Sequence, residues 1–280
     1  MADFLIGLLT AVVIAYAAHR AHALNRGGAI GAAVLGTVVF GLGGVGWAAV
    51  MLTFFITSTA LSKVFKTKKA RTGDNFAKGA NRDAWQVAAN GGLAGVAALS
   101  FFILKQFAPS YILMPLLWVA FSAGLAGANA DTWGTELGVL NPRQPVLLTN
   151  LRRVPMGTSG AISLVGTLAA LAGSALVASV AVWAGRLGWA PQGGLGAWRI
   201  FTAITGAGLV GALVDSLLGA TLQAMYHCPA CDKHTEKHPT HTCGEPTLHV
   251  RGLPWLNNDG VNLMCTLSAA LAGVVFVLLL

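Results

Sequence analysis

The sequence predicts an all-α fold, a polytopic membrane bundle of about eight transmembrane helices with its N-terminus outside. Hydrophobic residues make up 55% of the 280 residues, charged residues only 10%, and mean hydropathy is +0.67. Globular chains carry about 25% charged residues, so this chain has too few to cover a soluble surface. The net charge of +8 is then explained by basic membrane-flanking loops, and we expect no nucleic-acid partner.

Eight apolar segments approach the length of about 20 helical residues that a bilayer core requires. They are 3–20, 27–43, 45–62, 84–104, 111–130, 160–184, 198–223 and 261–280. The first has no basic flank before it and no cleavage site after it, which predicts a retained helix. Glycines at 41–46 predict a tight hairpin between the second and third segments or, alternatively, one re-entrant element. We expect residues 1–280 to form a single integral membrane domain, within which 224–256 is a cytoplasmic Cys/His-rich loop.

Basic residues concentrate in the loops after the first, third, fifth and seventh segments. The opposite loops hold only Lys105, Arg186 and Arg199. Because cytoplasmic loops carry the excess of Lys and Arg, the odd-numbered loops are predicted to face the cytoplasm. We therefore expect a protein of the bacterial inner membrane with its active site on the cytoplasmic side.

The segment 129–136 carries two acidic residues, Asp131 and Glu136, at the end of the fifth predicted helix. Helical spacing places Asn129, Thr132 and Glu136 on one face, with Asp131 one step around it. Mg²⁺ prefers hard oxygen ligands and retains waters, so these groups suit a magnesium–phosphate complex. The alternative is solvation of a helix end at the membrane interface.

Two further acidic residues, Asp215 and Asp259, lie in or beside the last two segments. A carboxylate within a membrane helix is costly, so Asp215 indicates a second metal or substrate site or, alternatively, an ion pair with an arginine. An N-cap at Asn258 or Asp259 would explain part of the polar run at 257–262. We expect the four carboxylates to be catalytic magnesium ligands, with substrate contacts from Ser216, Gln223, Asn258 and Asn262.

Two groups of residues are candidate phosphate ligands. Arg82, Gln86 and Asn90, spaced by four, form a polar stripe entering the fourth segment, and Arg82 is the expected phosphate clamp. The lysines between 63 and 71 are expected to anchor the chain to the membrane surface. The second group lies at the expected N-terminus of the sixth helix and consists of Arg152, Arg153, Gly157, Thr158 and Ser159. Free backbone N–H groups at a helix N-terminus bind anions, which would make this group a phosphate site. Alternatively, Thr158 or Ser159 is a simple helix cap.

The loop 224–256 contains three of the four cysteines. Cys228 and Cys231 form a C-x₂-C pair that Cys243 follows, and this spacing resembles a small zinc knuckle. His241, or alternatively His234 or His238, would complete a tetrahedral structural Zn²⁺ site. A loop without metal is the other interpretation.

Five segments together, 81–91, 130–138, 154–160, 215–223 and 257–262, resemble the phytyl-phosphate kinase family of plastids and bacteria, which is related to transmembrane protein nineteen. The resemblance covers nearly the whole chain, and its motifs occur in order. It implies phosphorylation of a membrane-embedded isoprenyl monophosphate, phytyl or geranylgeranyl phosphate, to the diphosphate that feeds tocopherol and phylloquinone synthesis. A similarity to the CTP-using polyprenol kinases implies CTP as the nucleoside triphosphate.

Two other function classes use similar residues. A lipid-phosphate cytidylyltransferase needs the same groups, and a membrane transporter also carries intramembrane carboxylates, although these should spread through the midplane between repeated halves. The prenyl chain, the nucleotide and the oligomeric state, a homodimer included, are left open by the sequence.

Overall fold

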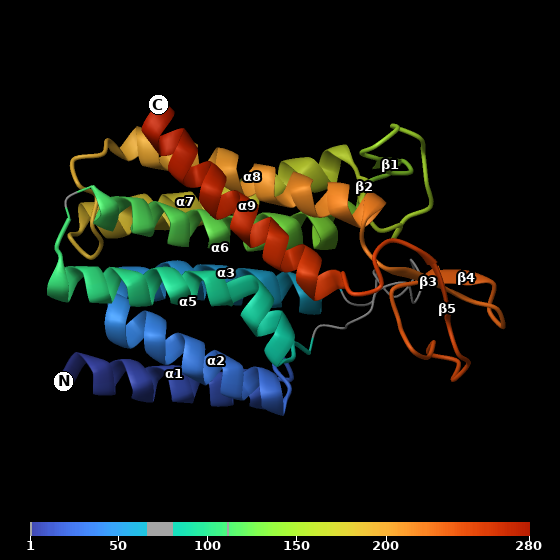
Figure 1. Ribbon diagram of the computed structural model, residues 1–280, viewed down its shortest axis with the longest axis horizontal. Coiled ribbons are helices and arrows are strands. Elements are labelled where there is room, and N and C mark those ends of the chain that lie inside the picture. Colours follow the sequence, from blue (N-terminus) through green and yellow to red (C-terminus); the bar gives the residue numbers. More distant parts are fainter. Residues whose placement is uncertain (1, 66–80, 111) are drawn as a thin grey trace.

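The computed structural model describes residues 2–65, 81–110 and 112–280 and is mostly helical (Figure 1). Its long helices are α1 (Ala2–Arg20), α2 (Arg26–Val38), α3 (Val45–Val64), α5 (Ala84–Phe107), α6 (Leu113–Gly138), α7 (Leu164–Arg186), α8 (Ala197–Thr221) and α9 (Asn258–Leu279). Within the described residues, seven helical segments are long and apolar enough to cross a membrane, and the apolar part of α1 is shorter. The prediction of a polytopic helical membrane protein is confirmed. The basic residues between 66 and 78 lie outside the described residues.

The glycine-rich connection at 41–46 separates two helices. α2 continues into a π-helical turn, η1 (Val39–Gly43), and α3 begins at Val45. Gly44 lies between them with φ +93°, a left-handed conformation that residues with a side chain rarely adopt. The chain reverses direction here, as expected for a hairpin (Figure 1). Lys63, near the end of α3, accordingly donates to Ala21 O, shortly before α2 begins, at 2.7 Å.

Helix α6 forms the centre of the bundle and packs against α3, α5, α7, α8 and α9. Small residues allow the close approach: a Cβ added at Gly127 of α6 would lie 2.7 Å from the Ala269 Cβ of α9. Aromatic side chains fill the end where α6 begins, since the Trp47 ring lies 4.9 Å from Phe101, 5.2 Å from Trp118 and 4.5 Å from Phe121, measured between centroids. This end is packed apolar core.

The other end of the bundle carries the polar structure. Both chain termini lie at the aromatic end, whereas the strands extend from the opposite end (Figure 1). β1 (Val146–Leu147) pairs with β2 (Ala161–Ile162), and β3 (Met225–Cys228) pairs antiparallel with both β4 (Lys233–Thr235) and β5 (Leu248–Arg251). The helical prediction did not include these short strands, because turn geometry rather than hydrophobic periodicity forms them.

The three-stranded sheet is fixed to the bundle through the end of α8. The Arg251 guanidinium donates to the backbone oxygens of Ala220 (2.6 Å) and Gly219 (2.8 Å), which the helix end leaves without helical partners. Leu253 N donates to Leu222 O at 2.8 Å. We call the region 224–256 the polar unit.

Candidate active site

A cavity of about 520 Å³ lies at the end of the bundle from which the polar unit extends. Residues from α5, α6, α8, α9 and the 157–160 loop line it, although they are far apart in the sequence. Fourteen of the predicted site residues are on its wall: Arg82, Gln86, Asn90, Asp131, Thr132, Glu136, Gly157, Thr158, Ser159, Asp215, Ser216, Gln223, Asn258 and Asn262.

Acidic side chains from two central helices enter this cavity. Asp131 and Glu136 belong to α6, which continues to Gly138, so Glu136 lies in the last turn as expected and Asp131 lies about two turns before the end. Glu136 is buried and accepts a hydrogen bond from Ser62 Oγ of α3 at 2.9 Å. Asp215 comes from α8, and the charges of Asp131 and Glu236 act on it. The cavity therefore concentrates negative charge where a cation can offset it.

Two polar atoms on the wall are buried without a hydrogen-bond partner among the described residues. They are Asp215 Oδ2 and Gln223 Nε2. Gln223 follows α8 rather than forming its last turn, and its Oε1 accepts from Ser159 Oγ at 3.1 Å. Buried polar groups are normally paired, so these two atoms indicate that the cavity is built for a polar ligand.

Arg82 is held rigidly at the cavity wall. Its backbone N–H donates to Ala23 O and its carbonyl accepts from Asn25 N, both at 3.0 Å, while its side-chain Nη2 donates to Ser58 Oγ at 2.9 Å. The guanidinium also lies over the Phe54 ring, 5.5 Å from the centroid. Burial lowers the pKa of Arg82 to about 10, although the Glu136 carboxylate acts in the opposite direction. Arg82 therefore stays a fixed cation at neutral pH.

The polar stripe that follows Arg82 has a second, structural role. Asp83 caps α5, and its side chain accepts from Gln86 N at 2.9 Å while Gln86 Oε1 accepts from Asp83 N at 3.1 Å. This reciprocal arrangement is a capping box. Asn90 Nδ2 donates to Gln86 O at 3.0 Å. Both amide side chains nonetheless line the cavity.

The 157–160 loop differs from the prediction. α7 begins at Leu164, and Ser163 is its N-cap, accepting from Gly166 N at 3.1 Å, so Thr158 and Ser159 do not cap a helix. Gly157 and Gly160 have φ values of +82° and +77°. A Cβ at Gly160 would lie 2.5 Å from Ser216 O of α8. The glycines thus let the loop fold against α8, and the loop reaches the cavity without a helix N-terminus.

Four predicted residues are not on the cavity wall: Asn129, Arg152, Arg153 and Asp259. Asn129 is fully buried, donates to Gly173 O at 2.9 Å and accepts from Thr57 Oγ1 at 3.0 Å, so it joins α6 to α7 and α3. Arg152 and Arg153 are exposed in the loop around β1. The cap of α9 is Asn257, which accepts from Gly260 N at 3.0 Å, rather than Asn258 or Asp259.

Several wall residues were not predicted. Ser62 comes from α3, and Glu236 and Lys237 come from the polar unit. The sequence neighbours of Lys237 give no sign that this loop folds back over the cavity. Ser62 lies in an apolar helix whose inward face cannot be identified from one sequence.

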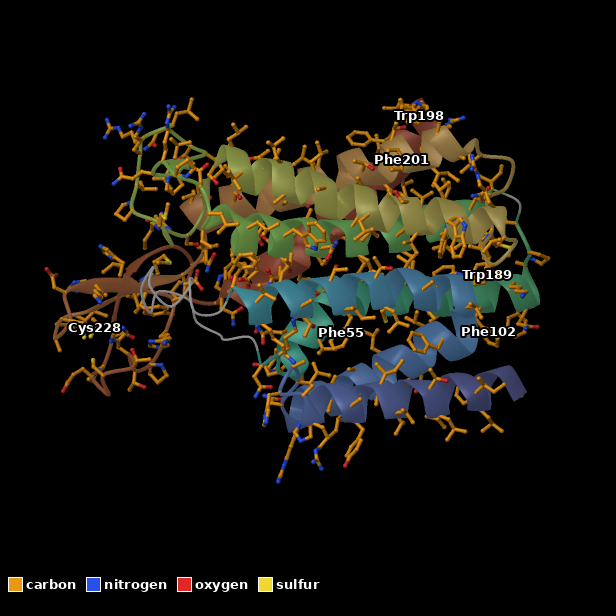
Figure 2. All side chains as sticks on the ribbon, turned by 180° about the vertical axis from the view of Figure 1, so that it is seen from behind. Phe55, Phe102, Trp189, Trp198, Phe201 and Cys228 are labelled. Carbon is orange, nitrogen blue, oxygen red and sulfur yellow. The ribbon has the colours of Figure 1, made fainter. Side chains whose placement is uncertain are left out.

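A second, apolar cavity of about 70 Å³ adjoins the first. It is lined by α1, α2, α3 and α5, with Phe55, Leu35 and Met51 among its walls, and Figure 2 shows Phe55 within the bundle. Arg82, Gln86 and Asn90 line both cavities. An amphiphile with a polar head and a hydrocarbon tail could therefore contact both across this stripe.

The predicted metal-binding side chains of the polar unit come together. The ligand atoms of Cys228, Cys231, His241 and Cys243 all lie within 4.8 Å of one another. Of the two other histidines considered, His234 is exposed and His238 stacks on Tyr226 with 4.3 Å between ring centroids. Figure 2 shows Cys228 at the end of the molecule away from Trp189.

Comparisons with known proteins give the family. The sequence pattern of the family described as integral membrane protein DUF92 matches residues 9–270. Protein PGR of Arabidopsis thaliana is 32% identical over 263 residues, covering 91% of this chain and 89% of that protein. An uncharacterized membrane protein of Methanocaldococcus jannaschii is 28% identical over 270 residues, covering 96% and 92%.

A further relative is Protein VTE6, chloroplastic, of Arabidopsis thaliana, which is 27% identical over 257 residues and covers 91% of this chain and 65% of that protein. No solved structure matches the chain. The family membership that the motifs indicated is confirmed: this chain belongs to the DUF92 family of integral membrane proteins.

Proposed function

We propose that the protein is a membrane-embedded phosphotransferase that converts an isoprenyl monophosphate to the diphosphate at the expense of a nucleoside triphosphate, CTP being the expected donor. One observation carries the proposal: a polar cavity with acidic and basic walls shares the Arg82, Gln86 and Asn90 stripe with an apolar cavity inside the bundle. This arrangement suits a substrate whose charged head and hydrocarbon tail must be bound together.

The polar cavity has the charges that two phosphate groups require. Arg82 and Lys237 supply positive charge on its wall, and Ser159, Ser216 and Thr132 supply hydroxyl groups. A guanidinium donates in a fixed planar pattern that matches phosphate oxygens. The carboxylates on the wall would repel the nucleoside triphosphate and the isoprenyl phosphate, so both can bind only if a cation accompanies the nucleotide.

The carboxylates fit Mg²⁺ by their chemistry. Asp131, Glu136 and Asp215 offer hard oxygen ligands, and Asp215 Oδ2 has no hydrogen-bond partner within the described part of the chain. When bound, Mg²⁺ would neutralise charge on the transferred phosphoryl group. We propose these three residues as its ligands; Asp259 lies outside the cavity lining.

The reaction needs little covalent work from the protein. An oxygen of the isoprenyl phosphate attacks the γ-phosphorus, the bond from that phosphorus to the β–γ bridging oxygen breaks, and the nucleoside diphosphate leaves. The acceptor phosphate is already a competent nucleophile, so no strong general base is required. Catalysis then rests on positioning and charge neutralisation, which Arg82, fixed by Ser58 and the backbone around Ala23, is suited to provide.

The distribution of basic residues supports one orientation of the site. Arg152, Arg153, Lys233 and Lys237 lie at the cavity end of the molecule, while Arg199 lies near the opposite end of the bundle, where its Nε donates to Val277 O. We propose that the cavity end faces the cytoplasm of a bacterial inner membrane.

A product assay tests the proposal. The purified protein is given phytyl or geranylgeranyl phosphate with each of the four nucleoside triphosphates and Mg²⁺, and the lipids are identified by mass spectrometry. We expect an isoprenyl diphosphate together with a nucleoside diphosphate. A nucleotide-linked lipid with pyrophosphate would instead identify a cytidylyltransferase, and intact lipid under all conditions would refute both activities.

A further inference from the structure

Four potential metal ligands in the polar unit come from two tight turns. Cys228 is the last residue of β3 and Cys231 lies in the turn between β3 and β4, whereas His241 and Cys243 lie in a second turn in which Gly244 N donates to His241 O at 2.9 Å. Gly244 has φ +91°, so the second turn depends on glycine. Both turns direct their side chains to one point, because all four ligand atoms lie within 4.8 Å of one another.

The ligand atoms lie at separations close to those of a tetrahedral zinc site. Zn–S and Zn–N bonds of about 2.3 and 2.0 Å place ligand atoms on a tetrahedron about 3.5–3.8 Å apart. Cys228 Sγ lies 3.6 Å from Cys243 Sγ, and His241 Nδ1 lies 3.2 Å from the same sulfur. A disulfide would require a sulfur separation of about 2 Å and would leave the third thiol unused. Three thiols and one imidazole leave no open position, which is the composition of a structural zinc site.

Apart from its three-stranded sheet and the hydrogen bonds of that sheet to α8, the polar unit has only a small apolar core. Within it, buried apolar side chains are few: Ala224, Met225, Tyr226 and Leu256. Units below about 40 residues rarely fold on a hydrophobic core alone and use a metal or disulfides instead. The most buried cysteine, Cys228, lies at the end of β3 and so connects the cluster to the sheet.

The cluster and the cavity share one folded segment. Lys237 N donates to Thr235 Oγ1 at 3.1 Å, and Thr247 Oγ1 donates to Lys237 O at 3.1 Å. Thr247 N also donates to Pro239 O at 3.0 Å. These bonds bind the segment 235–239 to the chain that returns from the His241–Cys243 turn. Glu236 and Lys237 of this segment also line the large cavity.

We infer that the protein holds one structural Zn²⁺ on Cys228, Cys231, His241 and Cys243, and that this ion keeps the segment 235–239 in place as a wall of the cavity. The zinc site stands independently of the proposed reaction. Only the expected role of Lys237 toward a phosphate group rests on the proposed function.

Metal content tests the site directly. Protein purified without added chelator is analysed for zinc by mass spectrometry, alongside Cys228→Ser, Cys243→Ser and His234→Ala. We expect about one zinc per chain in the wild type and in His234→Ala, whose imidazole is in the same unit but outside the cluster, and background levels in both cysteine variants. A wild type without zinc, a disulfide among these thiols, or equal zinc loss in His234→Ala would overturn the inference.

Hydrogen exchange tests the positioning role without relying on a variant that folds. Zinc is removed from the wild-type protein with a mercurial and EDTA and is then restored. We expect the amides of 235–247, Thr247 among them, to lose protection on removal and regain it on addition of zinc, while those of α6 stay protected. Unchanged protection of 235–247 would overturn the positioning role. Neither readout depends on catalysis, so a failed product assay would leave both results intact.

Discussion

Replacing Asp215 with asparagine should separate catalysis from stability. The substitution keeps the shape of the side chain and removes one negative charge from a cavity wall where Asp131 and Glu236 act on it. If the carboxylate meets a cation in the transition state, its loss should cost about 3–4 kcal/mol, or a fall of about 10²–10³ in kcat. The folded state should not suffer, because Asp215 Oδ2 has no hydrogen-bond partner to lose among the described residues.

Stability should increase to the extent that Asp215 is ionised when no cation is bound, because its carboxylate is then repelled by Asp131 and Glu236. Two like charges near a protein surface repel by up to about 4 kcal/mol at 4 Å, and less at greater separation. Relief of about 1 kcal/mol would raise Tm by roughly 2–4 °C in a domain of 150–250 residues, and we expect an increase of this order here. The assays are phosphoryl transfer to isoprenyl phosphate and thermal unfolding in the same detergent.

The matched control is Asp232→Asn, which removes the same charge from a side chain that is 96% exposed and keeps an oxygen for its 3.0 Å contact with His227 Nε2. It should change neither quantity. Wild-type activity in Asp215→Asn would refute the catalytic role, and a joint loss of activity and Tm would show that Asp215 stabilises the fold instead.

Three further changes probe the other parts of the site. Arg82→Lys removes the planar guanidinium that donates to Ser58 Oγ. It should raise KM for isoprenyl phosphate, measured by initial rates, about 10-fold or more. An unchanged KM would exclude Arg82 as the phosphate ligand. Ala32→Leu adds bulk to the wall of the 70 Å³ apolar cavity. It should raise KM for geranylgeranyl phosphate but not for a five-carbon isoprenyl phosphate. Equal changes in KM for both substrates would show that the isoprenyl tail binds outside this cavity. The C-terminus lies at the end of the bundle opposite the cavity (Figure 1). An alkaline phosphatase fused after Leu280 should therefore be active in the periplasm, whereas green fluorescent protein fused at the same position should not fluoresce. The reverse result would invert the proposed orientation.

The sequence predicted the helices and most of the polar residues that line the cavity, but not how the loops and buried side chains are arranged around it. Apolar length alone located the helices, because a bilayer demands runs of about 20 residues. Asp131, Asp215 and Arg82 could be identified from the sequence because an ionisable side chain in or beside a membrane helix is energetically costly and therefore indicates a functional site. The prediction failed where tertiary contacts decide: Asn129 has the same polar character, yet its amide joins α6 to α7 and α3.

Loop residues show the same limit. Residues 157–160 have the composition of an anion-binding helix N-terminus, but Ser163 caps α7 instead. Gly160 allows this loop to pack closely against α8. Lys237 is four residues from His241 and reaches the cavity only because the polar unit folds back. Neither outcome is encoded in local spacing. Both depend on which distant element the loop meets.

The position of the Arg82 stripe explains how a membrane helix can contribute to both kinds of cavity. α5 begins with a capping box, so its first turn is stable without apolar contacts, and polar side chains can occupy its next two turns. Further along, Gly91 and Gly95 leave room for the Leu35 side chain of α2, and the helix becomes apolar. The polarity of the α5 surface therefore changes within about two turns, or roughly 11 Å. A substrate lying along this helix would meet cationic and amide groups at its head and hydrocarbon at its tail. Arg82 lies just before this helix at the polar cavity, and Ala32 of α2 lines the apolar cavity. Substitutions at these two positions should therefore affect binding of the head and of the tail of the same substrate, respectively.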